Sequence, residues 1–202
     1  MTNFFDKARL TSDSEMQRIW SAILSGEANT PGTFSKRTVN MLASLEKTDA
    51  EQFQLLCRFN WHVGQLGDWP ILFDTKSGTP RNCGLTWSVL RHLDEIGLIT
   101  YEGLSGAVIN GEPLNKSQWF RSLIPLGYRD RNFLVYPGEG TQLGLGKVKL
   151  SRAGIDLARI CEAGGPVPGY CEEVLEHWRA AGAKVIELKE GTQITPAVFG
   201  IE

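Results

Sequence analysis

The sequence predicts an α+β protein, in which an N-terminal three-helix part packs on a region of mixed helices and strands, followed by a C-terminal helix and strand. Three observations support this class. Apolar residues in the first third recur with helical spacing, the middle changes to short apolar runs separated by glycine, and a glycine- and proline-rich stretch precedes the last helical pattern. The chain has 202 residues, 42% hydrophobic and 22% charged, which is typical of a globular domain.

Composition also excludes several classes of protein. No run approaches the roughly 18 apolar residues that a membrane span requires, and residues 1–7 lack the apolar core of a secretion signal. The four cysteines form no CxxC pair and no dense disulfide framework. We therefore expect a cytoplasmic protein with free thiols and no contact with a membrane.

The first third is predicted to form three amphipathic helices. The first begins at a capping box, Ser12–Glu15, and ends at Gly26; the second follows an N-cap at Ser35; the third begins at another capping box, Thr48–Glu51. Their apolar positions recur three or four residues apart, as in Trp20, Ile23 and Leu24, then Val39, Leu42 and Leu45, then Phe53, Leu56 and Phe59. Short helices of this kind stabilise one another by packing. We predict a helical subdomain over residues 1–66.

The middle of the chain alternates strands and helices. We predict a strand at Trp69–Phe73, a helix from Leu85 that ends at Gly97, a strand at Leu98–Tyr101, two β segments at 120–126 and 133–136, and a strand at 147–150 leading into a helix capped by Ser151. Two glycine-rich stretches, 103–111 and 138–146, are expected to be loops. The final segment contains a Gly/Pro linker, a helix that ends at Gly182 and a strand at 184–188.

Two parts of this middle region resemble the winged-helix superfamily. Leu85–Tyr101 resembles its recognition helix and first wing strand, and Leu150–Leu157 resembles the exit from the wing into the next helix. The resemblance implies that the glycine-rich stretches form wing loops. The predicted boundaries are a winged-helix-like subdomain over 67–163 and an extension over 164–202; one compact unit is the alternative.

A motif in the first third is more distinctive. Residues 20–38 read W-x-x-I-L-x-G-E-x-x-x-P-G-x-F-S-x-R-T. This pattern resembles the signature of an uncharacterised bacterial family, domain of unknown function 2806, strongly over residues 5–59 and weakly to about residue 178. The family has no established activity to carry over. Its association with mobile elements and defence-like gene neighbourhoods implies a role in phage defence or genome maintenance.

A structural role for this motif is favoured over a catalytic one. Glutamate and arginine with no nucleophile or base make a poor active site. We expect a buried ion pair between Glu27 and Arg37, a turn at Pro31-Gly32 and an aromatic ring in the core. The predicted structural residues are Glu27, Pro31, Gly32, Phe34, Ser35 and Arg37.

Basic residues suggest a binding surface. Residues 116–152 carry seven basic and two acidic side chains in a chain whose net charge is −2. They can contact a polyanion, or they can simply discourage strand edges from pairing. If the region binds nucleic acid, the recognition helix would enter the major groove and a basic wing would contact phosphates. The candidate residues are Arg81, Trp87, Ser88, Arg91, Arg129, Arg131, Lys147 and Lys149. Asp94 and Glu95 on the same helix leave a protein partner equally open.

Catalytic and metal sites are not evident. The three histidines stand far apart, with no cysteine or carboxylate at zinc-site spacing, and there is no GxSxG, GxGxxG or P-loop pattern. We predict no catalytic residue, metal or cofactor. The alternative is a metal-dependent nuclease or defence effector that uses Asp74-x-Lys76 or Glu187-x-Lys189. The leading hypothesis is a non-catalytic bacterial binding or regulatory module for DNA or a protein, in an oligomeric state that the sequence leaves open.

Overall fold

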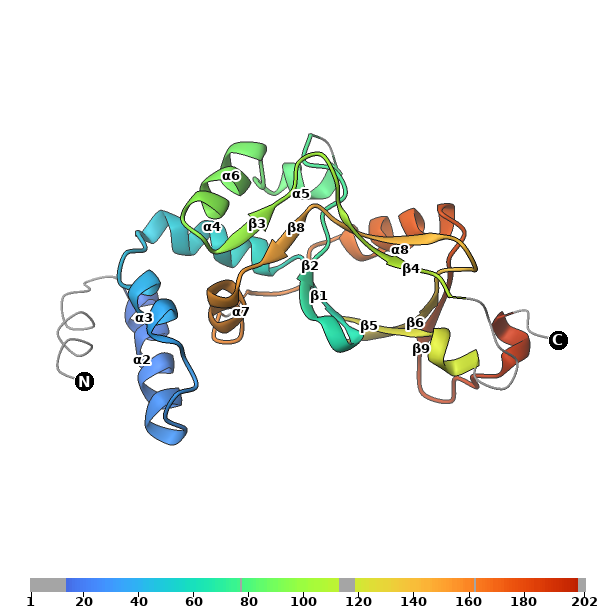
Figure 1. Ribbon diagram of the computed structural model, residues 1–202, viewed down its shortest axis with the longest axis horizontal. Coiled ribbons are helices and arrows are strands. Elements are labelled where there is room, and N and C mark those ends of the chain that lie inside the picture. The colour runs from blue at the N-terminus through green and yellow to red at the C-terminus, as the bar shows by residue number, and fades with distance from the viewer. Residues whose placement is uncertain (1–13, 77, 113–118, 162, 200–202) are drawn as a thin grey trace.

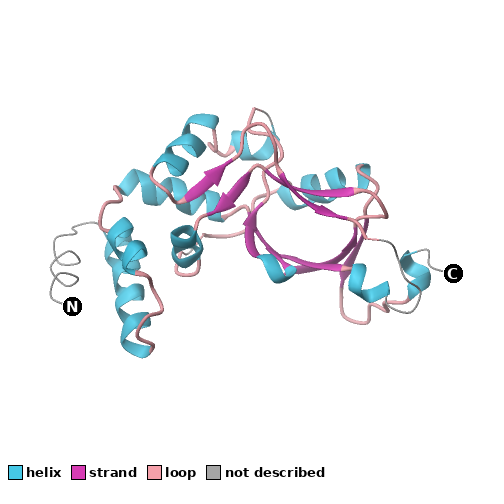
Figure 2. Cartoon of the chain, viewed as in Figure 1, coloured by secondary structure: helices cyan, strands magenta, loops and turns pink. Residues whose placement is uncertain are grey.

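The computed structural model describes residues 14–76, 78–112, 119–161 and 163–199 and confirms the α+β class. The N-terminal helices lie at one end of an elongated molecule, and the strands of a curved five-stranded sheet lie toward the other (Figures 1 and 2). Two smaller strand pairs lie above and beside this sheet.

Three helices form the N-terminal part, as predicted: α2 (Ser14–Asn29), α3 (Lys36–Leu42) and α4 (Lys47–Cys57). Ser35 caps α3 by accepting a hydrogen bond from the Thr38 amide at 3.0 Å, which confirms that prediction. The capping box expected at residues 12–15 begins outside the described residues. The elements between these helices are short turns.

Two predicted helix boundaries are wrong. The first helix continues past Gly26 to Asn29, because the backbone of Gly26 accepts a hydrogen bond from the Thr30 amide and remains helical. The third helix begins after Glu46 rather than at Thr48. Glu46 and Asp49 cap each other's backbone amides there, two residues before the predicted box.

The five-stranded sheet is antiparallel throughout. Its order is β2 (Gly67–Pro70), β1 (Asn60–Val63), β5 (Ile124–Tyr128), β6 (Arg131–Tyr136) and β9 (Lys184–Leu188). Helix α8 (Tyr170–Ala180) contributes Val174, Leu175 and Trp178 to the core beside it. Strand β1 was not predicted, and residues 119–122 form a 3₁₀ turn, η2, where a strand was expected.

The other elements form a second group. It consists of α5 (Gly78–Asn82), α6 (Trp87–Glu95), β3 (Ile99–Tyr101) paired with β8 (Val148–Leu150), and α7 (Arg152–Ala158). Ser151 caps α7 through the Gly154 amide at 3.0 Å, as predicted. Strand β4 (Ala107–Asn110) pairs with β7 (Gln142–Gly146).

The glycine-rich stretches are therefore not simple loops, which corrects that prediction. Each contains a strand, and their glycines allow backbones to approach closely. Gly146 has a φ of +85°, and a Cβ there would lie 2.5 Å from the carbonyl oxygen of Leu72, with which it forms a β-bridge. Strands β3 and β8 are not joined by a short wing, because β4, β5, β6 and β7 all lie between them in the chain.

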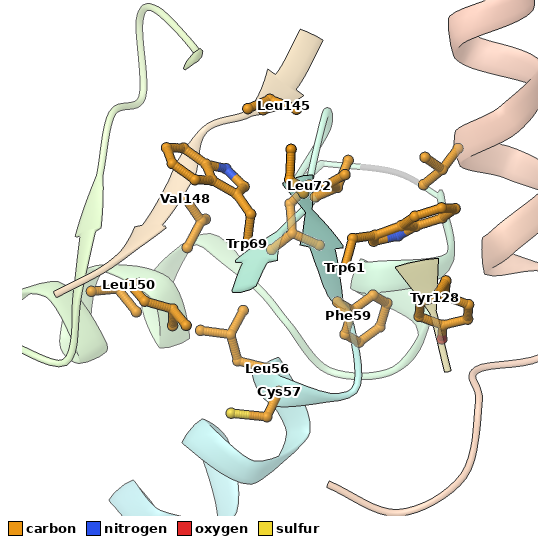
Figure 3. Packing of buried hydrophobic residues seen from close by; sticks show 14 of the residues in the cluster. Leu56, Cys57, Phe59, Trp61, Trp69, Leu72, Tyr128, Leu145, Val148 and Leu150 are labelled. Carbon is orange, nitrogen blue, oxygen red and sulfur yellow. The ribbon is translucent and has the colours of Figure 1, made fainter. Parts of the chain in front are cut away.

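One hydrophobic core connects the three predicted segments. Its buried residues run from Trp20 in α2 to Ala183 before β9, and β9 pairs with β6 of the middle segment. At its centre Trp61 stacks on Tyr128, with ring centroids 5.1 Å apart (Figure 3). The Trp61 indole also donates to the Tyr170 hydroxyl at 3.1 Å, which satisfies its buried N–H.

Candidate functional site: the outer face of helix α6

Helix α6 has one buried face and one exposed face. Thr86 caps it, and Leu90 and Leu93 are fully buried. On the opposite side Trp87 has 59% of its surface exposed, which is unusual for the largest apolar side chain. This outer face borders an open hollow of about 510 Å³, whose lining residues are Trp87, Ser88, Arg91, His92, Glu95, Tyr101 and Gly103.

The β3–β4 loop completes this surface. Leu104 follows Gly103 and is fully exposed. The ammonium group of Lys147 donates to the Gly103 carbonyl at 3.1 Å and so fastens the loop to the start of β8. We call the set Trp87, Ser88, Arg91, Tyr101 and Leu104 the α6 surface. Three of the predicted site residues, Trp87, Ser88 and Arg91, thus lie together.

The positive charge of Arg91 on the α6 surface is paired with acidic residues of the same helix. Arg91 lies 3.2 Å from the Asp94 carboxylate and 3.3 Å from that of Glu95, both on its own helix. Arg81 is exposed on the neighbouring α5, and its side chain makes no ion pair with any described residue. Lys149 lies over the Trp69 ring at 5.7 Å. The α6 surface is therefore aromatic and mixed in charge rather than strongly basic.

The predicted basic wing does not form, because Arg129 and Arg131 belong to a different surface. Arg129 lies in the β5–β6 turn, and Arg131 is the first residue of β6 in the five-stranded sheet. The Arg131 guanidinium forms two hydrogen bonds with Glu187, at 2.7 and 3.1 Å, and one with Glu172 at 2.7 Å, and these carboxylates raise the pKa of Arg131. The same contacts hold the pKa of Glu187 below its ordinary value.

His92 has a positioning role that the sequence did not reveal. Its Nε2 lies 2.6 Å from Asp49 Oδ1, which joins α6 to α4 at the edge of the hollow. The second oxygen of Asp49 accepts the Glu46 amide at the start of α4. One buried carboxylate thus fixes both a helix N-terminus and the helix that carries Trp87. Two residues 43 positions apart give no local pattern that could have predicted this pair.

Two residues of the family-like motif, Glu27 and Phe34, make contacts within the local fold. The Glu27 carboxylate accepts hydrogen bonds from the amides of Gly32 at 2.9 Å and Phe34 at 2.6 Å, and these bonds lower the pKa of Glu27. The expected Glu27–Arg37 ion pair is wrong: Arg37 is exposed and forms no ion pair with the described residues. Phe34 packs instead on Gly26, where a Cβ would lie 2.7 Å from the ring.

A second hollow, of about 600 Å³, lies against strands β1, β5 and β6. Its polar lining includes His62, Asp68 and Arg129, and its wall includes Cys57 and Cys161. His62 Nδ1 lies 3.4 Å from Asp68 Oδ1, and both groups are partly exposed. Arg129, whose φ is +58°, approaches the Cys57 carbonyl at 3.5 Å.

The acidic residue of each nuclease-like motif makes a local contact. Arg131 already holds the Glu187 carboxylate, and Asp74 accepts the amide of Lys76 at 2.8 Å in a local turn. Among the residues that the structure describes, no group of three or more His, Cys, Asp or Glu side chains is arranged to hold a metal ion. Within the same residues, no helix is both long and apolar enough to cross a membrane.

The fold and these surfaces define an α+β protein in which helix α6, with an exposed aromatic face, packs on a core whose buried residues run from Trp20 to Ala183. The family described as Protein of unknown function (DUF2806) matches residues 1–167, and the chain belongs to this family. The search of curated proteins and the search of solved structures gave no match.

Proposed function

We propose that this chain is a non-catalytic binding module that engages a protein partner through the α6 surface. The observation that carries the proposal is the 59% exposure of Trp87 beside the fully exposed Leu104. Tryptophan and arginine are the residues most often found at the energetic centre of protein interfaces. Helix α6, β3 and β8 also retain the order that we interpret as winged-helix-like.

Electrostatics favour a protein over DNA as the partner. Nucleic-acid affinity comes mainly from unpaired cations that neutralise phosphates. Here Arg91 is paired within its helix, and Arg131 is paired with two carboxylates elsewhere. Only modest phosphate attraction remains at the α6 surface. We place the module in the bacterial cytoplasm, because all four cysteines are free thiols.

A comparison of matched variants tests this proposal. Trp87→Ala removes the exposed ring, and Phe120→Ala is the control, because Phe120 is also 59% exposed but lies on η2. Both substitutions should leave Tm nearly unchanged. Proteins captured from the host bacterium, quantified by mass spectrometry, should include a partner that wild type and Phe120→Ala retain and that Trp87→Ala loses by tenfold or more, as expected of about 2 kcal/mol at an interface centre.

A second experiment tests DNA binding directly, by fluorescence anisotropy with labelled duplex DNA at low and near-physiological salt. We expect weak binding that Trp87→Ala does not change. Salt-sensitive duplex binding that Trp87→Ala or Arg81→Ala abolishes would assign the surface to DNA instead. Retention of the same proteins by all three chains would overturn the proposal.

A further inference from the structure

Two cysteines from distant parts of the chain meet at the wall of the second hollow. Cys57 ends α4, and Cys161 follows α7, roughly 100 residues later in the chain. Both side chains line this wall, and a side-chain hydrogen bond with Cys161 is the main influence that raises the pKa of Cys57. Cys57 is only 3% exposed (Figure 3), whereas Cys161 is partly exposed and faces the open hollow.

We propose that Cys57 and Cys161 form a thiol-modification site, which a small disulfide of the glutathione type oxidises to an intramolecular disulfide. Two thiols already in hydrogen-bond contact need only a small approach to reach bonding distance. Cys57 is the last residue of α4, and Cys161 lies three residues after the end of α7. The hollow gives a tripeptide disulfide access to Cys161.

The order of reaction follows from the two environments. The hydrogen bond with Cys161 and burial both raise the pKa of Cys57, while Arg129 acts in the opposite direction. Cys57 therefore stays a thiol, and the more accessible Cys161 reacts first. Its thiolate attacks one sulfur of the oxidant, forming a mixed disulfide and releasing one glutathione thiolate. Cys57 then loses its proton and attacks the Cys161 sulfur, releasing the second glutathione. Two protein thiols are oxidised, and one glutathione disulfide is reduced to two thiols.

The other cysteines provide internal controls. Neither Cys83 nor Cys171 contacts another thiol among the described residues. Burial raises the pKa of Cys171 to about 11, which makes it a poor nucleophile at neutral pH. A double variant, Cys83→Ser with Cys171→Ser, should thus retain the complete reaction.

The test uses the full chain, oxidised glutathione and a thiol-alkylating reagent. After oxidation, two of the four thiols should escape alkylation, and peptide mass spectrometry should detect a Cys57–Cys161 cross-link that dithiothreitol removes. A disulfide that closes so long a loop should also raise Tm by roughly 5–15 °C, reversibly. Cys57→Ser should stop the reaction at a glutathione adduct on Cys161, and Cys161→Ser should leave Cys57 unmodified.

Several results would overturn the proposal. Full alkylation of Cys57 and Cys161 after prolonged treatment with excess oxidised glutathione is one. A cross-link to Cys83 or Cys171 in place of the expected pair is another. Loss of the cross-link in the Cys83→Ser/Cys171→Ser variant, with its Tm in the reduced state unchanged, is a third.

Discussion

Thr38 should contribute more to stability than its small size suggests. It is fully buried, and its hydroxyl donates to Asp156 Oδ2 at 2.9 Å, which ties α3 to α7. Asp156 is 1% exposed, and its other oxygen has no hydrogen-bond partner. Arg152 Nε lies 3.7 Å from this oxygen, but the Arg152 side chain is 75% exposed. The Thr38 hydroxyl is therefore the main group that stabilises this buried carboxylate.

Thr38→Val replaces the hydroxyl with a methyl group of similar size, so the loss should be electrostatic rather than a packing defect. A hydrogen bond to a charged group contributes about 1.5–3 kcal/mol, and leaving the buried acceptor unpaired places the cost at the upper end. We expect the free energy of unfolding to fall by about 2.5 kcal/mol and Tm to fall by roughly 5–10 °C. Urea denaturation should show a lower midpoint with an unchanged slope.

Two further variants make this prediction specific. Thr48→Val makes the same change at an exposed position in the first turn of α4 and should cost less than about 0.5 kcal/mol. Thr38→Ser keeps the hydroxyl and should cost about 1 kcal/mol for the lost methyl group. If Thr38→Val costs no more than Thr48→Val, the hydrogen bond does not stabilise the fold, and the reasoning is refuted.

Two more predictions concern other contacts. Gly154→Ala should destabilise the protein by 2 kcal/mol or more in urea denaturation, because the new Cβ would lie 2.1 Å from the Leu98 carbonyl oxygen, whereas Gly165→Ala, with no atom within 4 Å, should be nearly neutral. Because Arg131 lowers the pKa of Glu187 in the folded state, the stability from this pair is present above the ordinary glutamate value of 4.5 and is lost as pH falls through the folded pKa. The stability difference between wild type and Arg131→Gln should therefore narrow below about pH 4 in Tm measurements, and a constant difference would contradict this account.

The helix caps illustrate what the sequence can predict. Ser35 and Ser151 were identified correctly, because each lies three residues before the amide that it caps and precedes an apolar helical stripe. The capping box predicted at Thr48 was wrong by two residues. Glu46 and Asp49 offered the same reciprocal chemistry two residues earlier, and the local pattern did not distinguish them.

The contacts that shape the candidate surfaces could not be predicted in this way. Arg131 was assigned to a basic wing because its sequence neighbours are basic, but its charge partners lie 41 and 56 residues further along the chain. Strand β1 shows only four residues of alternation directly after a helix. Glycine has no side chain to show an alternating pattern, so the glycine-rich stretches that contain β4 and β7 were predicted as loops.

The contacts of individual side chains distinguish residues that stabilise the fold from residues that are available for binding. In the family-like motif, Glu27 satisfies two backbone amides, Ser35 caps a helix and Thr38 reaches Asp156, so the fold itself accounts for each of these polar groups. Trp87 has no such explanation. Burying its ring would contribute about 2 kcal/mol or more, yet α6 turns it to solvent while Leu90 and Leu93 occupy the core. Helix α6 thus keeps its largest apolar side chain exposed while the contact of His92 with the buried Asp49 holds the helix in place, and this supports the proposal that Trp87 contacts a partner.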